Sequence, residues 1–149
     1  MLGKEEQANV FTCLHDGGFT ELLRDGDAIR IFVEINYVAE LVDPDYTGFQ
    51  CVLTDCRSFC FELYDGRRVD NLLQILELDL EIGHAEVSND QVAVYCRCER
   101  DLEGNWCDEG LGGILYFDAR DIRIFNEAGN EMSLDELIGI CNRYWSEHD

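Results

Sequence analysis

The sequence predicts an α+β protein, with a mostly antiparallel, rolled or sandwiched β-sheet of about nine short strands and one C-terminal amphipathic helix. Short segments of alternating apolar and polar residues, separated by turn-forming residues, run along most of the chain. The pattern changes to helical spacing only near the end. With 149 residues, 46% hydrophobic content and one proline, the chain is expected to form a single domain spanning residues 1–149.

The last third of the chain carries the clearest local signals. Residues 114–117 and 122–125 both alternate, so two strands joined by a turn at residues 118–121 are expected. Ser133 and Glu136 have the spacing of a capping box, which marks the start of a helix. Apolar residues then recur on one helical face, at Leu134, Leu137, Ile138, Cys141, Tyr144 and Trp145.

The first two thirds are expected to be mainly hairpins. The segments at 49–54 and 59–63 alternate on either side of residues 55–58, which predicts a hairpin there. Residues 37–42 fit either an extension of the preceding strand or one helical turn. The strands expected before residue 100 lie at residues 8–14, 19–23, 29–35, 49–54, 59–63, 76–82 and 92–98.

The charge of the chain limits its partners. Lys and Arg number 11 and Asp and Glu 32, which gives 11 − 32 = −21. A domain this acidic repels nucleic-acid phosphates and anionic membranes, so neither is expected as a partner. Cationic partners are favoured instead, and the alternative is that the acidity serves only solubility.

A cytoplasmic location is expected, because no signal peptide and no stretch of roughly 20 apolar residues is present. The eight cysteines are therefore expected to be reduced. Several take inward strand positions and no pair has zinc-ligand spacing, so we predict core thiols, no metal site and no cofactor.

The dipeptide His15-Asp16 is the most suggestive chemical feature. One interpretation is a small metal-dependent enzyme or metal-binding domain, but a histidine-aspartate site needs further histidines, and only His84 and His148 remain. The other interpretation is a turn in which the Asp16 carboxylate accepts nearby amides and His15 packs beside it. No nucleophile elbow or phosphate-binding loop is present, so no catalytic residue is assigned.

Two acidic segments are candidate partner-binding surfaces. In the strand expected at residues 76–82, strict alternation places three acids on one face, where they dock a partner or pair with outward arginines. The polar loop at residues 99–112 surrounds Trp106 with acids, which resembles an interface anchor in a charged rim. Alternatively, Trp106 plugs one end of the sheet. The candidate partner-binding residues are Trp106, Glu103, Asp108, Glu109, Asp101, Glu77, Asp79 and Glu81.

Residues 11–17, Phe-Thr-Cys-Leu-His-Asp-Gly, are followed by an Asp-Gly hairpin and an alternating strand. This arrangement resembles a loose group of small bacterial domains that open with a Phe-His-Asp-Gly or Phe-His-Asp-Ala type motif. Leu14 stands where those domains usually have phenylalanine. Some of them sit beside polymorphic toxins as immunity proteins. The resemblance implies a cytosolic binding protein such as a toxin neutraliser, with no catalytic residues to transfer.

Taken together, these observations lead us to expect a non-catalytic acidic protein that captures a basic protein partner, such as a nuclease toxin. Two alternatives stay open. One is the metal-dependent enzyme or metal-binding domain on His15 and Asp16. The other is an acidic mimic of DNA, which requires carboxylates spaced like phosphates along one face.

Overall fold

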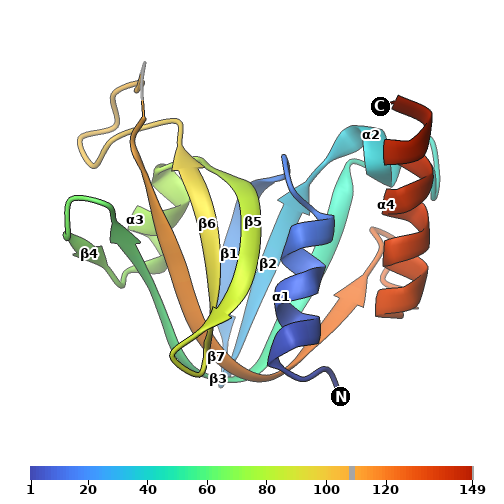
Figure 1. Cartoon of the computed structure of the whole chain (residues 1–149), viewed down its shortest axis with the longest axis horizontal. Helices are drawn as coiled ribbons and strands as arrows, with labels where there is room; N and C mark the ends of the chain where they lie inside the picture. The colour runs from blue at the N-terminus through green and yellow to red at the C-terminus, as the bar shows by residue number, and fades with distance from the viewer. Residues whose placement is uncertain (108–109, 149) are drawn as a thin grey trace.

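The computed structural model describes residues 1–107 and 110–148. Within these residues the fold is α+β, as the sequence predicts: an eight-stranded antiparallel sheet with a long C-terminal helix and three shorter helices (Figure 1). No described helix is long and apolar enough to cross a membrane. The strands are β1 (Gly18–Asp25), β2 (Ala28–Glu34), β3 (Gly48–Leu63), β4 (Arg68–Val69), β5 (Leu80–Ser88), β6 (Gln91–Cys98), β7 (Gly112–Phe125) and β8 (Glu131–Met132). The helices are α1 (Lys4–Cys13), α2 (Asn36–Ala39), α3 (Leu72–Glu77) and α4 (Leu134–His148).

The sheet rolls up because β3 pairs with β2 along one edge and with β7 along the other. The strands follow one another around the ring in the order β3, β2, β1, β5, β6 and β7. The longest ladder joins β3 to β7, from Gln50 opposite Phe125 to Leu63 opposite Gly113. The shortest joins β1 to β5 through the single pair Gly18 and Glu81, so the ring has a seam there.

The core lies inside this rolled sheet, and α1 packs against β5 and β6 beside the seam (Figure 1). The Phe11 ring of α1 meets Phe19 and Phe117 edge to face, at centroid distances of 6.3 and 5.6 Å. Along β6, alternate side chains are buried, whereas Tyr95 and Arg97 point to the outer face. The outer face of β5 and β6 is therefore open to solvent over much of its area.

The strand expected at residues 8–14 is wrong, because residues 4–13 form α1. The buried positions have helical spacing and form a face that packs on the sheet. They are Gln7, Ala8, Val10, Phe11 and Leu14.

The two hairpins expected within residues 49–63 and 114–125 are also wrong, and each segment is one continuous strand. Asp55 adopts a left-handed backbone with φ 48°, and the β3–β7 register shifts between Cys56 and Ser58. This irregularity bends the strand without reversing it. Two short strands that the sequence did not predict, β4 and β8, bring the sheet of the described residues to eight strands, in place of the nine expected.

The strand expected at residues 76–82 begins only at Leu80. Residues 72–77 form α3 instead, because the Asn71 side chain caps the helix by accepting a hydrogen bond from the Gln74 amide at 3.0 Å. Asp79 then takes a left-handed conformation with φ 52°, which separates α3 from β5. The three acids of this segment therefore do not share one strand face.

The C-terminal helix is as expected. The Glu136 amide donates to the Ser133 hydroxyl and the Ser133 amide donates to the Glu136 carboxylate, each at 3.1 Å, which completes the capping box. Leu137 and Cys141 are buried on the face that α4 turns toward the core. The open question at residues 37–42 is resolved by the short helix α2.

Candidate functional site

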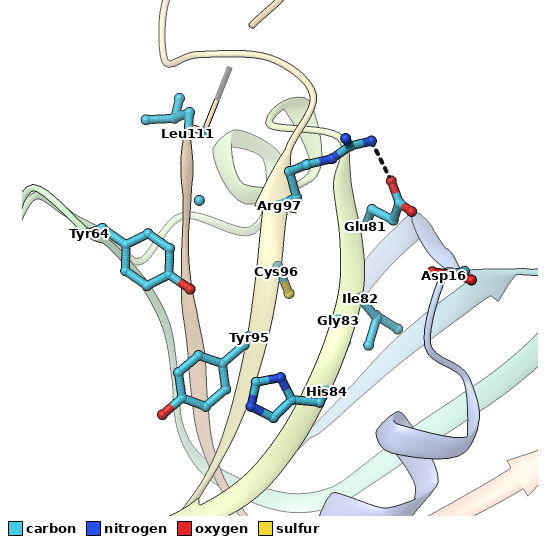
Figure 2. Close-up of a pocket in the computed structure, with 12 residues that line it drawn as sticks. Asp16, Tyr64, Glu81, Ile82, Gly83, His84, Tyr95, Cys96, Arg97 and Leu111 are labelled. Carbon is cyan, nitrogen blue, oxygen red and sulfur yellow. Dashed lines mark hydrogen bonds and ion pairs between the residues drawn. The ribbon is translucent and has the colours of Figure 1, made fainter. Parts of the chain in front are cut away.

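A groove crosses the outer face of β5 and β6 and reaches the start of β7 (Figure 2). We call it the outer groove. Its volume is about 490 Å³, within the range of small-ligand pockets. Residues 110–112 line one end, and the side chains along it belong to Asp16, Tyr64, Glu81, His84, Tyr95 and Arg97.

Tyr64 forms one wall of the outer groove from just beyond the end of β3. Its side chain is 63% exposed, and its amide donates to the Gly112 carbonyl at 3.0 Å. A Cβ added to Gly112 would lie 3.0 Å from the Tyr64 ring and 2.8 Å from the Cys96 carbonyl oxygen. Gly112 therefore leaves the space that the tyrosine ring occupies. Burial raises the pKa of Tyr64, so its phenol is uncharged at neutral pH.

Tyr95 and His84 form a second aromatic surface from neighbouring strands. Their rings are stacked, with centroids 4.5 Å apart and planes 5° apart. The Tyr95 hydroxyl donates to the Glu86 carboxylate at 2.7 Å. This hydrogen bond, helped by burial, raises the pKa of Tyr95 to about 12. The groove thus presents neutral aromatic rings with a carboxylate at their edge.

Arg97 lies at the other side of the outer groove, where Figure 2 shows it paired with Glu81. Its guanidinium donates to the Glu81 carboxylate at 2.7 Å and to the Glu99 carboxylate. Glu81 and Arg97 are direct neighbours across β5 and β6. For Glu81, the structure therefore shows cross-strand pairing. Since one cation faces two carboxylates, this cluster keeps a net negative charge.

Asp16 lies where the chain crosses the seam of the ring. Its φ is 72°, and its amide donates to the Ile82 carbonyl at 2.8 Å. Within the described residues, the Asp16 carboxylate forms no hydrogen bond or ion pair and is exposed at the groove. The expectation that this carboxylate caps the turn is wrong, because the backbone amide fastens the turn to β5.

His15 packs beside that turn. Its ring stacks on Trp145, with centroids 4.4 Å apart, and its Nδ1 atom lies 2.8 Å from the Thr12 carbonyl oxygen. In the part of the chain that the structure describes, no three His, Cys, Asp or Glu side chains are grouped to hold a metal ion.

The loop between β6 and β7 carries Trp106, whose side chain is 65% exposed. The Arg100 guanidinium lies 3.9 Å from the centre of the indole, and the two residues form an isolated β-bridge. The alternative in which Trp106 plugs the end of the sheet is therefore excluded. The Asp101 carboxylate accepts hydrogen bonds from the Asn105 and Glu103 amides, each at 2.9 Å. These bonds, and the one from Asn105 most of all, hold the pKa of Asp101 below its usual range. Asp101 therefore shapes the loop.

The structure separates the sequence-predicted site residues into three places. Trp106, Asp101 and Glu103 share the loop, and Glu81 lies in the outer groove. Glu77 is exposed at the end of α3, and Asp79 follows it in a turn, where its carbonyl accepts from the Glu99 amide at 3.2 Å. The predicted residues Asp108 and Glu109 lie outside the described residues.

Sequence reasoning did not select Tyr64, His84 or Tyr95 as site residues. Alternation along β6 does place Tyr95 and Arg97 on the outer face, and this was the available signal. The position of Tyr64 depends on the pairing of β3 with β7. The sequence does not predict this pairing, because it predicts a turn within each of the two segments. Comparisons of the chain with protein-family models, with curated proteins and with solved structures found no match.

Proposed function

We propose that this protein is a non-catalytic binding protein that captures a basic protein partner. The observation that carries the proposal is Trp106, a large aromatic side chain 65% exposed on an acidic loop of a chain with a net charge of −21. An aromatic anchor within a charged rim is typical of interface hot spots. Arg100 stacks on the indole and holds its orientation before any partner arrives.

The acidic surface is not neutralised from within. At least seven of the 11 basic residues form ion pairs, and the eight pairs found in the described residues engage eight of the 32 acidic residues. The remaining carboxylates produce a field that attracts a cationic surface and repels an anionic one. Such complementarity acts mainly by accelerating association.

The resemblance of residues 11–17 to small bacterial domains found beside toxins supports a toxin as the class of partner. A nuclease is the most suitable example, because an enzyme that holds nucleic-acid phosphates carries a basic surface. A neutraliser that occupies this surface needs acids and an anchor but no catalytic group of its own.

The test measures binding of basic proteins encoded by the genes adjacent to this one, by surface plasmon resonance at about 50 and 500 mM salt. We expect association to slow strongly at high salt. Trp106→Ala should weaken binding by about 2 kcal/mol or more. Glu103→Lys should slow association more than Glu40→Lys, a matched charge reversal at the end of α2.

Two results would count against the proposal. The first is a bound partner whose affinity is unchanged by Trp106→Ala. The second is that Glu103→Lys and Glu40→Lys slow association equally. In that case the loop would contribute only through the net charge of the protein.

A further inference from the structure

We propose that the outer groove is the recognition site for an arginine side chain of the basic partner. The guanidinium would lie against the aromatic faces of Tyr64 and Tyr95, and the carboxylate of Asp16, which lines the opposite side of the same groove, would attract it at longer range (Figure 2). This inference rests on the proposed function, since it names the partner side chain that this protein would recognise. It assigns a role to a groove separate from the Trp106 anchor.

The first support is the aromatic lining. Tyr64 is 63% exposed, and Tyr95 is braced by the stacked His84 ring (Figure 2) and by the hydrogen bond of its hydroxyl to Glu86. The Tyr95 ring is therefore held in place, and both rings are neutral at physiological pH. A cation over a tyrosine face is attracted by the ring quadrupole, and a preformed surface reduces the ordering cost of binding.

The second support is the balance of charge around the groove. Arg97 is the one cation among the described residues that line it, and Glu81 and Glu99 already bind its guanidinium. Asp16 lines the same groove and has no ion-pair partner in the described residues. The groove therefore keeps a net negative charge, and a cationic side chain of a partner can compensate part of it.

The third support is that the protein itself packs guanidinium groups in this way nearby. Arg100 stacks on Trp106 at 3.9 Å, and Arg97 bridges two carboxylates at the groove. An incoming guanidinium would repeat the first contact on the tyrosine rings. A lysine ammonium is less suited, because it is more strongly hydrated and lacks the planar face that stacks on a ring.

The volume limits what the groove can hold. About 490 Å³ is enough for one extended side chain with its adjoining backbone, and too little for a folded element. An arginine on a loop or an extended segment of the partner meets this limit. An anionic ligand does not fit, because the surrounding acids would repel it.

The test is an NMR titration of the full chain with N-acetyl-arginine methylamide, in parallel with the lysine and citrulline compounds. Citrulline keeps the shape of arginine but carries no charge. We expect saturable shifts at Tyr64, Tyr95 and Asp16 with arginine, weaker shifts with lysine and none with citrulline. Tyr64→Leu should weaken arginine binding about three- to fivefold, whereas Tyr64→Phe retains the ring and should retain most of the affinity.

A matched pair of variants separates the groove from the overall charge. Asp16→Asn and Asp45→Asn each remove one exposed carboxylate, but only Asp16 lines the groove. We expect about two- to fivefold weaker binding for the first and no change for the second. Equal effects, equal binding of lysine, or shifts spread over the whole surface would overturn the proposal.

This result is independent of the partner assay. If a basic protein binds through Trp106 while arginine causes no NMR shifts at the groove residues, the proposed function stands and this inference fails. If arginine binds in the groove while Trp106→Ala has no effect on any basic partner, the site stands and the loop-based function fails.

Discussion

The imidazole of His15 stacks on the indole of Trp145, with ring centroids 4.4 Å apart and planes 17° apart. His15 follows α1, whereas Trp145 lies near the end of α4. Tyr37 of α2 meets the same indole edge to face, at a centroid distance of 6.1 Å. The aromatic cluster therefore fastens three helices to one another, and the histidine that the sequence marks as a candidate metal ligand takes part in packing.

This cluster makes Trp145 the more costly residue to remove from α4. We expect Trp145→Ala to lower the free energy of unfolding by about 3 kcal/mol, near the lower limit for buried tryptophan because the side chain is only half-buried. Ser133→Ala removes the N-cap and should cost about 1 kcal/mol. Urea unfolding of both variants gives the ranking, and a larger loss for Ser133→Ala would show that the cluster contributes little.

Trp106 should behave in the opposite way to Trp145, although these are the two tryptophans of the chain. Trp106→Ala should change the free energy of unfolding by less than about 1 kcal/mol, because its main contact is an exposed cation–π pair with Arg100. The variant should also remove most of the fluorescence that acrylamide quenches. A loss of several kcal/mol would contradict the exposed loop described above.

Gly113 tests the close approach of β3 and β7. A Cβ at this position would lie 2.3 Å from the Glu62 carbonyl oxygen and 2.7 Å from the Phe61 ring, so Gly113→Ala forces the ladder apart. We expect a loss of about 2–3 kcal/mol or failure to fold. Gly139→Ala is the matched control, since nothing lies within 4 Å and the residue is exposed in α4. It should stabilise the protein by about 1 kcal/mol.

Glu127 predicts a pH dependence of stability. Its carboxylate accepts from the Thr47 amide, from the Thr47 hydroxyl at 2.8 Å and from the Gly48 amide at 2.9 Å, and these bonds hold its pKa below the ordinary value of 4.5. Because the folded pKa is lowered, this stabilisation is complete above pH 4.5 and is lost as the pH falls through the folded pKa.

We therefore expect Glu127→Gln to destabilise the protein by about 1 kcal/mol at neutral pH, with the difference disappearing in acid. Thermal unfolding between neutral pH and about pH 3 measures this convergence. Glu40→Gln, which removes an exposed glutamate at the end of α2, is the matched control. A difference for Glu127→Gln that grows toward acid would contradict the lowered pKa.

The thiols should divide into two classes. Cys13 and Cys107 are half-buried and the other six are buried, and no disulfide joins any of these described cysteines. The hydrogen bond from the Cys141 thiol holds the pKa of Cys13 below its usual range, so Cys13 should react first with a thiol reagent. Eight thiols should titrate after unfolding, and metal analysis should find no stoichiometric zinc. Loss of the fastest phase in Cys13→Ser identifies the residue.

Sequence patterns succeed here where one face of an element is wet. The alternation along residues 29–35 and 92–98 indicates which side chains enter the core, since β2 and β6 each have one outer face. The capping box at Ser133 correctly predicts the start of α4, because its hydrogen bonds join residues only three positions apart in the sequence. The helix at residues 4–13 is missed because Val10, Phe11 and Thr12 are residue types that favour strands, and only the tertiary contact of Phe11 with the sheet decides the outcome.

The outer groove required information that no local pattern contains. Asp55 and Asp118 are residues typical of turns, yet each lies within a continuous strand whose partner is distant in sequence. Once β3 and β7 are read as single strands, Tyr64 comes to lie over Gly112 and beside the outer face of β6. The loop around Trp106 was identifiable in advance, because its composition and length are local properties.

The long ladder between β3 and β7 has a consequence for biosynthesis. Gln50 pairs with Phe125 and Leu63 with Gly113, so the edge of β3 that faces β7 has no partner until nearly all of the chain has left the ribosome. Closing such large loops before any contact forms is entropically costly and slows folding. Until then one edge of a strand containing Phe49, Phe59 and Phe61 stays unpaired and prone to aggregate, so folding should be completed after translation and should be sensitive to expression rate and chaperone supply.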